Sequence, residues 1–353
     1  MIRFTLCVCQ FGLFALPAQA AFTSLYVFGD GVCTTTTGPG GSSYYGRSYS
    51  NGRIWIEVLA QRQGLAYESN KNWSYFGHSS SDLVVNVGNF AAPPDAGTAL
   101  FVIWVDDADF VYNVQNYGTN STTWRNALNR SLTNHFKALT NLYAKGARTV
   151  VMPNAVDLTK APNYVGTAAG VKSFIRQRVI EFNSGFAATV NQAMASLPGL
   201  EIYVPDVFSL LDDVVANPAD YGLTNALYRG QSIAALDDPA LNNKALNGPG
   251  TNYIFWDYLD PTAKFHAVLA DEVQQLITPV QFRALTALGG STRLELANIP
   301  VGRNGFVESS SDFVIWTTAA SIVSTNVTQS GVVPDTEPLQ FYRLRFPFAW
   351  TWP

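Results

Sequence analysis

The sequence is poor in charged residues and cysteine, and beyond its first twenty positions it has no long apolar run. Of its 353 residues, 14% are charged, with 22 basic side chains against 26 acidic ones. The net charge of -4 excludes the clustered basic surface that nucleic-acid binding requires. After residue 20, no stretch reaches the ~18 uncharged apolar residues of a membrane-spanning helix. These absences argue against a nucleic-acid-binding protein and an integral membrane protein.

Cysteine occurs three times, at Cys7, Cys9 and Cys33. The first two lie in an apolar run that small residues close at Ala20, which is the pattern of a secretory signal peptide. A buried first strand is the alternative interpretation of this run. Cleavage after Ala20 leaves Cys33 alone, which excludes an intramolecular disulfide in the mature chain. We therefore expect residues 1–20 to be a signal peptide and the protein to be secreted, either to a periplasm or to the medium.

Short apolar runs alternate with longer helical patterns over most of the chain. The runs that are typical of buried strands are residues 24–28, 99–105, 148–152 and 201–204. Helical spacing predicts helices over residues 51–62, 122–145, 168–196 and 261–276. This alternation predicts a parallel sheet that is covered by helices on both faces. In such sheets, functional residues gather at the carboxyl ends of the strands.

The pattern changes after Pro279. Residues 280–353 show little helical periodicity and are rich in β-branched and aromatic residues. The strand-like runs here are residues 293–297, 305–309, 312–317 and 340–346. We therefore expect a main α/β domain over residues 21–279 and a small all-β module over residues 280–353, without a motif that suggests chemistry in the module.

Four segments of the main domain carry polar residues beside predicted strands or helices. They are residues 28–32 (FGDGV), 75–78 (YFGH), 104–110 (WVDDADF) and 255–262 (FWDYLDPT). In this order and at these spacings, they resemble the four sequence blocks of the GDSL (SGNH) esterase and lipase family. The resemblance covers about residues 24–278. It implies a three-layer α/β/α sandwich with a flavodoxin-like parallel sheet, and chemistry on ester bonds.

The resemblance also implies a role for five positions. In this family a serine attacks the ester, and its backbone N–H, a loop glycine and an asparagine side chain hold the oxyanion. An Asp-x-x-His pair supplies the orienting carboxylate and the base. These roles fall on Gly31, Gly77, Ala108, Asp257 and Asp260, so that only the loop glycine and the first aspartate keep the family's residue type. Without a hydroxyl nucleophile and an imidazole base, the serine mechanism is not available.

No neighbouring residue clearly replaces the missing groups. Cys33 lies two positions beyond the nucleophile position, about 7 Å along an extended chain, and is more typical of a small buried thiol. The threonines at 34–37 are typical of a turn, and His135 and His266 are predicted to pack within helices. His78 adjoins the loop glycine and is a candidate to line the cleft.

The aspartates leave several interpretations open. Asp260 before Pro261 is typical of a helix N-cap. If the fold is right, it also shares one end of the sheet with other carboxylates on loops: Asp30, Asp106, Asp109 and Asp257. Asp106, Asp109, Asp257 and Asp260 are conceivable oxygen ligands of Ca²⁺ or Mg²⁺. A carboxylate pair doing acid–base work is equally conceivable.

Two functions therefore remain open. The first is a secreted hydrolase-like protein that binds a small-molecule, lipid or carbohydrate ester but is impaired in its turnover. The second is an active hydrolase with a carboxylate-based or metal-assisted site. The sequence indicates no organic cofactor. The aromatic residues that flank the four blocks, and that are candidates to line the cleft, are Trp104, Phe110, Trp256 and Tyr258.

Overall fold

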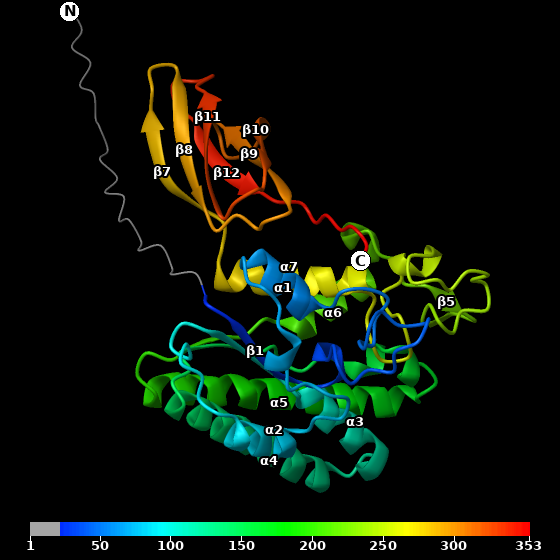
Figure 1. The fold of residues 1–353 in the computed structure, drawn as a ribbon. Coiled ribbons are helices and arrows are strands. Elements are labelled where there is room, and N and C mark those ends of the chain that lie inside the picture. The colour runs from blue at the N-terminus through cyan, green and yellow to red at the C-terminus, as the bar shows by residue number, and fades with distance from the viewer. Residues whose placement is uncertain (1–21) are drawn as a thin grey trace, which may run out of the picture. The chain divides into compact units, whose positions relative to one another are not determined.

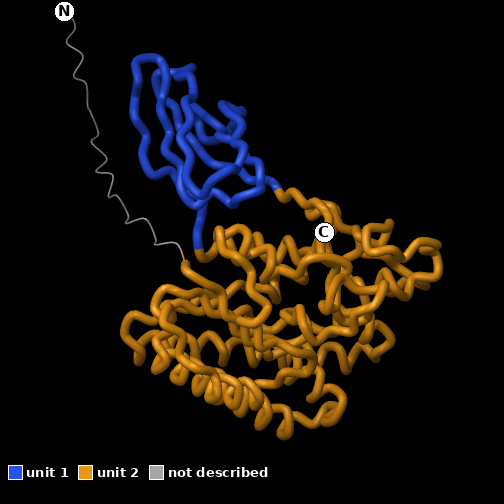
Figure 2. Tube along the Cα trace, viewed as in Figure 1, with its two compact units in different colours: residues 1–20, 278–347 blue, residues 21–277, 348–353 orange. Residues whose placement is uncertain are grey.

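The structure is a computed structural model that describes residues 22–353, so the predicted signal peptide lies outside the described residues. These residues form two compact units (Figure 2). One unit is Thr278–Pro347, and the other contains the residues up to Ile277 together with Phe348–Pro353. The last six residues therefore group with the α/β unit. Within the described residues, no helix is long and apolar enough to cross a membrane.

The α/β unit, which contains the residues up to Ile277, is built on a four-stranded parallel sheet. Its strands, in spatial order, are β1 (Leu25–Gly29), β2 (Leu100–Trp104), β3 (Thr149–Val151) and β4 (Glu201–Tyr203). Every residue of β1 and β2 is buried, because helices cover both faces of the sheet. The parallel sheet and the positions of its four strands are confirmed.

A further segment extends the sheet beyond β1. The backbone N–H of Trp73 donates to the carbonyl of Val27 at 2.8 Å, and that of Tyr75 donates to the carbonyl of Gly29 at 3.2 Å. This segment comes second along the chain but lies outside the first strand, which is the flavodoxin-like order. It also carries the loop that contains Gly77 to the carboxyl end of β1.

Helices cover the sheet in two layers (Figure 1). Their bounds are α1 (Trp55–Arg62), α2 (Ser80–Asn89), α3 (Asp106–Tyr117), α4 (Ser121–Ala144), α5 (Ala169–Ser196), α6 (Val207–Ala216) and α7 (Ala263–Ile277). Helices α1 and α7 pack together on one side of β1, and α4 packs against α2 and α5 on the other side. The three-layer α/β/α architecture is therefore confirmed.

The predicted helices are present, with small differences at their ends. Helix α1 begins at Trp55 instead of residue 51, because Asn51 is used elsewhere: its Oδ1 accepts the backbone N–H of Ala263 at 2.8 Å, at the start of α7. Helices α2, α3 and α6 were not predicted. Helices α2 and α3 adjoin or overlap two of the sequence blocks, where the polar residues suggested loops.

The all-β unit, Thr278–Pro347, consists of two three-stranded antiparallel sheets. One has the order β10 (Thr317–Val323), β9 (Asn304–Ser310), β12 (Phe341–Arg345), and the other has the order β11 (Thr328–Pro334), β8 (Ser291–Ala297), β7 (Gln281–Ala287). Its own buried core consists of Leu294, Leu296, Ile299, Val307, Ile322 and Val333. The predicted all-β module is thus confirmed.

One predicted strand of this module is wrong. Residues 312–317 form the turn between β9 and β10, with strand structure only from Thr317 onward. The carboxylate of Asp312 accepts the backbone N–H groups of Val314 and Ile315 at 2.8 and 2.9 Å. This side-chain capping closes a turn and removes the N–H groups that strand pairing would use.

Gly29, the last residue of β1, tests how tightly this end of the sheet is packed. A Cβ at position 29 would lie 2.4 Å from the Cβ of buried Cys33. We expect Gly29→Ala to lower the free energy of unfolding by about 3 kcal/mol, because overpacking a rigid core forces backbone shifts. Urea unfolding followed by circular dichroism measures this change.

Gly88 provides the matched control. It lies within helix α2, and a Cβ there would have open space around it. Gly88→Ala is expected to raise the free energy of unfolding by up to about 1 kcal/mol, because alanine favours the helix. Equal effects of the two substitutions would contradict the packing described for β1.

Candidate functional site

A cavity of about 140 Å³ lies at the carboxyl ends of β1 and β2. Its walls are mainly apolar side chains from α6, α7 and the loops that follow β1, β2 and β3, among them Val156, Leu158, Leu211, Phe255, Phe265 and Leu269. The carboxyl edge of a parallel sheet is the usual place for a ligand site in this kind of architecture. Trp104, at the end of β2, also lines the cavity.

The structure brings four of the five mapped positions to this cavity. Gly31, Gly77, Ala108 and Asp260 all line it. A Cβ built on Gly31 would lie 3.7 Å from Oδ1 of Asp260 and 3.1 Å from Cδ2 of Phe76. Gly77 has φ of +79°, a left-handed conformation that glycine adopts without strain. The position predicted for the nucleophile therefore faces the position predicted for the base.

The fifth position, Asp257, lies directly behind Asp260. Oδ1 of Asp257 accepts the backbone N–H groups of Leu259 and Asp260 at 2.9 and 2.8 Å. Its Oδ2 accepts the hydroxyl of Tyr44 at 3.1 Å. The Asp257 and Asp260 side chains also hydrogen-bond to each other. Asp257 therefore orients the residue at 260, as an orienting carboxylate would.

Burial decides the charge state of this carboxyl pair. Asp260 is buried, and burial together with the charge of nearby Asp257 raises its pKa well above the ordinary value. Burial also raises the pKa of Asp257, while the hydrogen bonds it accepts oppose that rise. Two carboxyls that share a hydrogen bond in an apolar site hold one proton between them. We assign that proton to Asp260, which makes it a hydrogen-bond donor to Asp257.

Asp30 connects the ends of two strands at the floor of the cavity. It is the N-cap of the short helix η1 (Gly31–Cys33), and its carboxyl accepts the backbone N–H of Val32 at 3.2 Å. It also accepts the backbone N–H of Ala108 at the start of α3. Burial raises the pKa of Asp30 to about 7.

The other acidic residues lie differently from the prediction. Asp106, Asp107 and Asp109 belong to the first turn of α3, where negative charge is favoured by the helix dipole, and not to a loop. Asp106 is buried away from the cavity lining. Asp109 lines a separate, more polar groove that adjoins the cavity on its outer side. Its Oδ1 accepts the backbone N–H of Ser80 at 3.1 Å.

The predicted metal ligands do not converge. Among the described residues, no group of three or more His, Cys, Asp and Glu side chains is arranged to hold a metal ion. Asp106 and Asp109 point to different surroundings from those of the Asp257–Asp260 pair. The N-cap interpretation of Asp260 is also wrong, because Oγ1 of Thr262 accepts the N–H of Phe265 at the start of α7.

His78 does not line the cavity. Its Nδ1 lies 2.8 Å from the carbonyl of Gly29, and its Nε2 lies 3.0 Å from Nδ2 of Asn86. Its ring is fully buried and stacks on Tyr75. Both ring nitrogens are thus engaged, and the side chain fixes the Gly77 loop to β1. The sequence predicted His78 in the cleft because His78 follows Gly77 directly. Adjacency in the chain does not determine the direction of a side chain.

The candidate replacements also lie elsewhere. Cys33 is a buried free thiol packed under Gly29, and burial raises its pKa, which disfavours the reactive thiolate. Nδ1 of His135 lies 2.8 Å from the carbonyl of Ser131. His266 is buried, and burial lowers its pKa to about 3. The Oγ1 of Thr34 accepts the N–H of Thr37 within a turn. None of these residues lines the cavity.

An outer groove of about 850 Å³ adjoins the cavity and was not predicted. The two share Phe76, Gly77, Ala108, Val111 and Leu259. The groove is more polar and carries exposed aromatic rings. Its lining includes Ser79, Asp82, Tyr112, Gln115, Arg130, Asn163 and Tyr258. Of the aromatic residues proposed for the cleft, Trp104 lines the cavity and Tyr258 the groove, whereas Phe110 and Trp256 are buried in the core.

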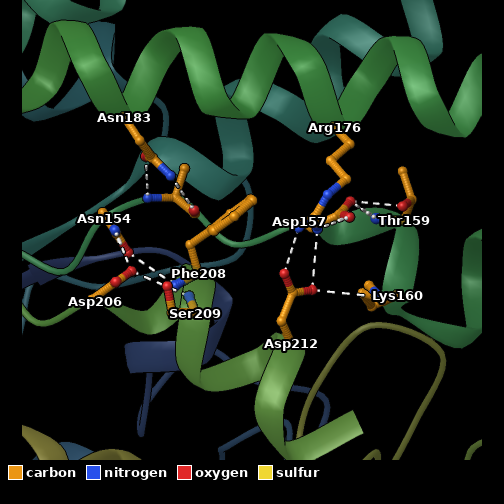
Figure 3. Close-up of polar contacts among 11 residues, drawn as sticks. Asn154, Asp157, Thr159, Lys160, Arg176, Asn183, Asp206, Phe208, Ser209 and Asp212 are labelled. Atoms are coloured by element: carbon orange, nitrogen blue, oxygen red, sulfur yellow. Dashed lines mark hydrogen bonds and ion pairs between the residues drawn. The ribbon is translucent and has the colours of Figure 1, made fainter. Parts of the chain in front are cut away.

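A polar network beside the cavity fixes the segment after β3 (Figure 3). Arg176 of α5 donates to Asp157 at 2.7 Å and pairs with Asp212 of α6 at 2.5 Å. Leu158 and Leu211, which adjoin these two aspartates, line the cavity. The network therefore holds one apolar wall in place. Lys160 also pairs with Asp212. Figure 3 shows a second, separate set of contacts, in which Asn183 bonds to the backbone of Ala155 and Asn154 donates to Asp206.

The fold and this site define an SGNH-type hydrolase scaffold. Residues 25–273 match the family model described as GDSL-like lipase/acylhydrolase. The chain belongs to this family. The assignment of its Ser, Asn and His positions to Gly31, Ala108 and Asp260 stays a prediction from the sequence.

The chain is similar to several curated relatives. It is 21% identical over 244 residues to the thermolabile hemolysin of Vibrio parahaemolyticus, covering 67% of this chain and 57% of the relative. It is 26% identical over 209 residues to the GDSL esterase/lipase APG of Arabidopsis thaliana, covering 56% and 58%. The chain thus spans less than two thirds of the length of these relatives.

The chain also has distant similarity to solved structures. The lipase Lip_vut3 from a goat rumen metagenome is 10% identical, with a TM-score of 0.44 and coverage of 72% of this chain and 97% of that chain. The acetylxylan esterase Axe2 from Geobacillus stearothermophilus is 11% identical, with a TM-score of 0.42 and coverage of 74% and 96%.

The buried carboxyl of Asp260 predicts an unusual pH dependence of stability. Folding raises its pKa, so the folded state favours the protonated form and loses stability as the pH rises above about 4. Asp260→Asn mimics the protonated form and avoids this loss. Each unit by which folding raises the pKa of a carboxyl corresponds to about 1.4 kcal/mol of folding free energy. We expect the stability of Asp260→Asn relative to the parent to rise by at least about this amount between pH 5 and pH 8.

Urea unfolding at the two pH values measures this difference. The matched control is Asp220→Asn, which removes an exposed carboxyl and should leave the parent's pH profile unchanged. A pH-independent difference between Asp260→Asn and the parent would show that position 260 is ionised in the folded protein.

Proposed function

We propose that this chain is a secreted ester-hydrolase-like protein in which serine-type ester hydrolysis is absent or strongly impaired, and whose cleft binds an acyl, lipid or carbohydrate ester. One observation supports this most directly. Among the described residues, the cavity that Gly31 and Asp260 share has no Ser, Thr, Cys or His in its lining. The proposal of secretion rests on the signal-peptide pattern of residues 1–20.

The size of the expected impairment follows from the missing groups. In a well-studied serine protease, loss of the nucleophile alone lowers turnover by about 10⁶. Loss of one oxyanion donor typically removes a further factor of roughly 10² to 10³. At Gly31 the backbone N–H remains but the hydroxyl does not, and Ala108 has no donor in its side chain. Serine-type turnover is therefore expected to fall below what a standard assay detects.

The shape of the site supports retained binding. The inner cavity is enclosed mainly by apolar side chains and suits an acyl group, whereas the adjoining groove is polar enough for a headgroup or a sugar. Ligand sites in proteins typically combine an apolar body with a few placed polar groups. The family acts on esters, and an apolar cavity beside a polar groove suits the two parts of an ester. Both observations favour an ester as the ligand.

A second candidate function rests on the Asp257–Asp260 hydrogen bond. Two carboxyls that share a proton are the acid–base pair of aspartic proteases. Asp260 faces the space above Gly31, where a water molecule would stand in place of the serine hydroxyl. Such a site would hydrolyse activated esters slowly and without a metal ion.

Restoring the family's residues provides the main test. We expect the triple variant Gly31→Ser, Ala108→Asn, Asp260→His to hydrolyse p-nitrophenyl butyrate at least about 10²-fold faster than the parent, since a placed general base contributes that much. The serine is compatible with the backbone at position 31, and half-exposed Phe76 has to shift by only a few tenths of an ångström. Release of nitrophenolate measures the rate.

Two controls make this test specific. A triple variant with Gly31→Ala has nearly the same volume but no hydroxyl, and it should remain at the parent's rate. Adding Asp257→Ala to the serine triple variant should remove most of the gain, because the imidazole then loses its orienting carboxylate. A well-folded serine triple variant without activity would contradict the mapping of the site.

The same ester assay separates the two candidate functions in the parent protein. The first predicts no turnover above the buffer rate. The second predicts slow turnover that Asp257→Ala or Asp260→Asn abolishes and that a chelator leaves unchanged. Turnover that depends on Asp257 would reject the first function, and turnover that a chelator abolishes would reject both.

A further inference from the structure

The charged groups around the inner cavity are all acidic. Among the described residues that line it, the ionisable side chains are Asp30, Asp107 and Asp260, and the lining contains no Lys, Arg or His. The cations near its wall are engaged elsewhere, since Arg176 and Lys160 pair with Asp212. Buried carboxylates normally have a cation or several donors as partners. The lining of this apolar cavity therefore carries three carboxyl groups and no cationic side chain to pair with them.

Asp107 is the member of this set with unused hydrogen-bonding capacity. Asp30 accepts backbone N–H groups of two neighbours, and Asp260 is bound to Asp257. The carboxylate of Asp107 accepts the backbone N–H of Val156, which lines the same cavity. Its Oδ1 is buried and has no hydrogen-bond partner within the described part of the chain. A buried acceptor of this kind in a native protein calls for a donor.

The size of the cavity limits what such a donor can be attached to. An engineered apolar cavity of about 150 Å³ binds benzene, and this cavity measures about 140 Å³. Its walls include the aromatic residues Phe255 and Phe265. One six-membered ring, or an aliphatic group of similar volume, therefore fills it.

We propose that the inner cavity binds a short apolar group that carries an ammonium or similar N–H cation, held by Asp107, and that it excludes carboxylates. This inference rests on the proposed function of the cleft as an ester-binding site and names the class of ligand. It implies an ester whose acyl or aryl part bears an amine. It also implies that a carboxylate, the ionised product of ester hydrolysis, binds poorly, because the lining offers it acidic side chains and no cation.

Three ligands of matched size test the inference on the full chain. They are benzylamine, benzyl alcohol and benzoate, which present an ammonium, a neutral hydroxyl and a carboxylate on the same ring. Calorimetric titration at pH 8 measures the dissociation constants. We expect benzylammonium to bind at least about tenfold more tightly than benzyl alcohol, and benzoate at least about tenfold more weakly. The reason is that a close charge pair in a buried site typically changes a dissociation constant by more than about tenfold.

A substitution locates the effect. Asp107→Asn should reduce the preference for benzylammonium over benzyl alcohol to less than about threefold, because the amide keeps an acceptor oxygen for a hydroxyl but loses the negative charge that attracts an ammonium. The matched control is Asp220→Asn, which changes the net charge equally at an exposed position and should keep the parent's preference. Because the three ligands are compared on the parent protein first, the test does not depend on the folding of the variant.

The outcomes distinguish this inference from the proposed function. Equal binding of the three ligands, or tightest binding of benzoate, would overturn the charge selectivity and leave the ester-binding cleft standing. A preference for benzylammonium that survives Asp107→Asn would overturn the role of Asp107. If none of the three ligands binds, binding of p-nitrophenyl butyrate is measured next. Binding of this ester would overturn only the proposed selectivity for an ammonium group. Its failure to bind would also overturn the proposed ester-binding cleft.

Discussion

The site depends on the parallel pairing of β1 and β2. In this register Gly29 lies opposite Trp104, so that the segments after the two strands leave the sheet at the same edge. Asp30 then connects these segments by accepting N–H groups from both. Gly31 and Ala108 are held beside each other by this pairing, and the Asp257–Asp260 turn completes the wall. Without the shared edge, the four sequence blocks would have no common cavity.

The framework of the site combines backbone and side-chain features. They are the left-handed glycine at position 77, the buried carboxyl at position 30 and the carboxylate at position 257, which accepts a backbone N–H of Asp260. At the three positions predicted for the family's reactive side chains, the chain has a glycine, an alanine and a buried carboxyl. The result is an apolar cavity with an acidic lining.

Burial explains why these carboxyls differ from ordinary surface aspartates. Removing a carboxylate from water disfavours its charged form, and like charges nearby add to the effect. Asp30, Asp107 and Asp260 experience both. They therefore favour protons or a bound cation, which relates the predicted pH dependence of stability to the proposed charge selectivity of the cavity. Asp109, in the same helix turn as Asp107, faces the outer groove and serves a structural role.

The sequence alone determined the α/β/α class, the four buried strands and the all-β module, because hydrophobic periodicity is a local property. The roles that block spacing assigns to Gly31, Ala108 and Asp260 stay predictions. Only the tertiary structure decided which polar residues share a cavity. His78 and Asp106 are buried outside the cavity lining, although both lie within two residues of predicted site positions, whereas Asp107 between Asp106 and Ala108 lines the cavity. Side-chain direction depends on the rotation of a helix turn and on contacts between distant segments, and neither is encoded in the order of neighbouring residues.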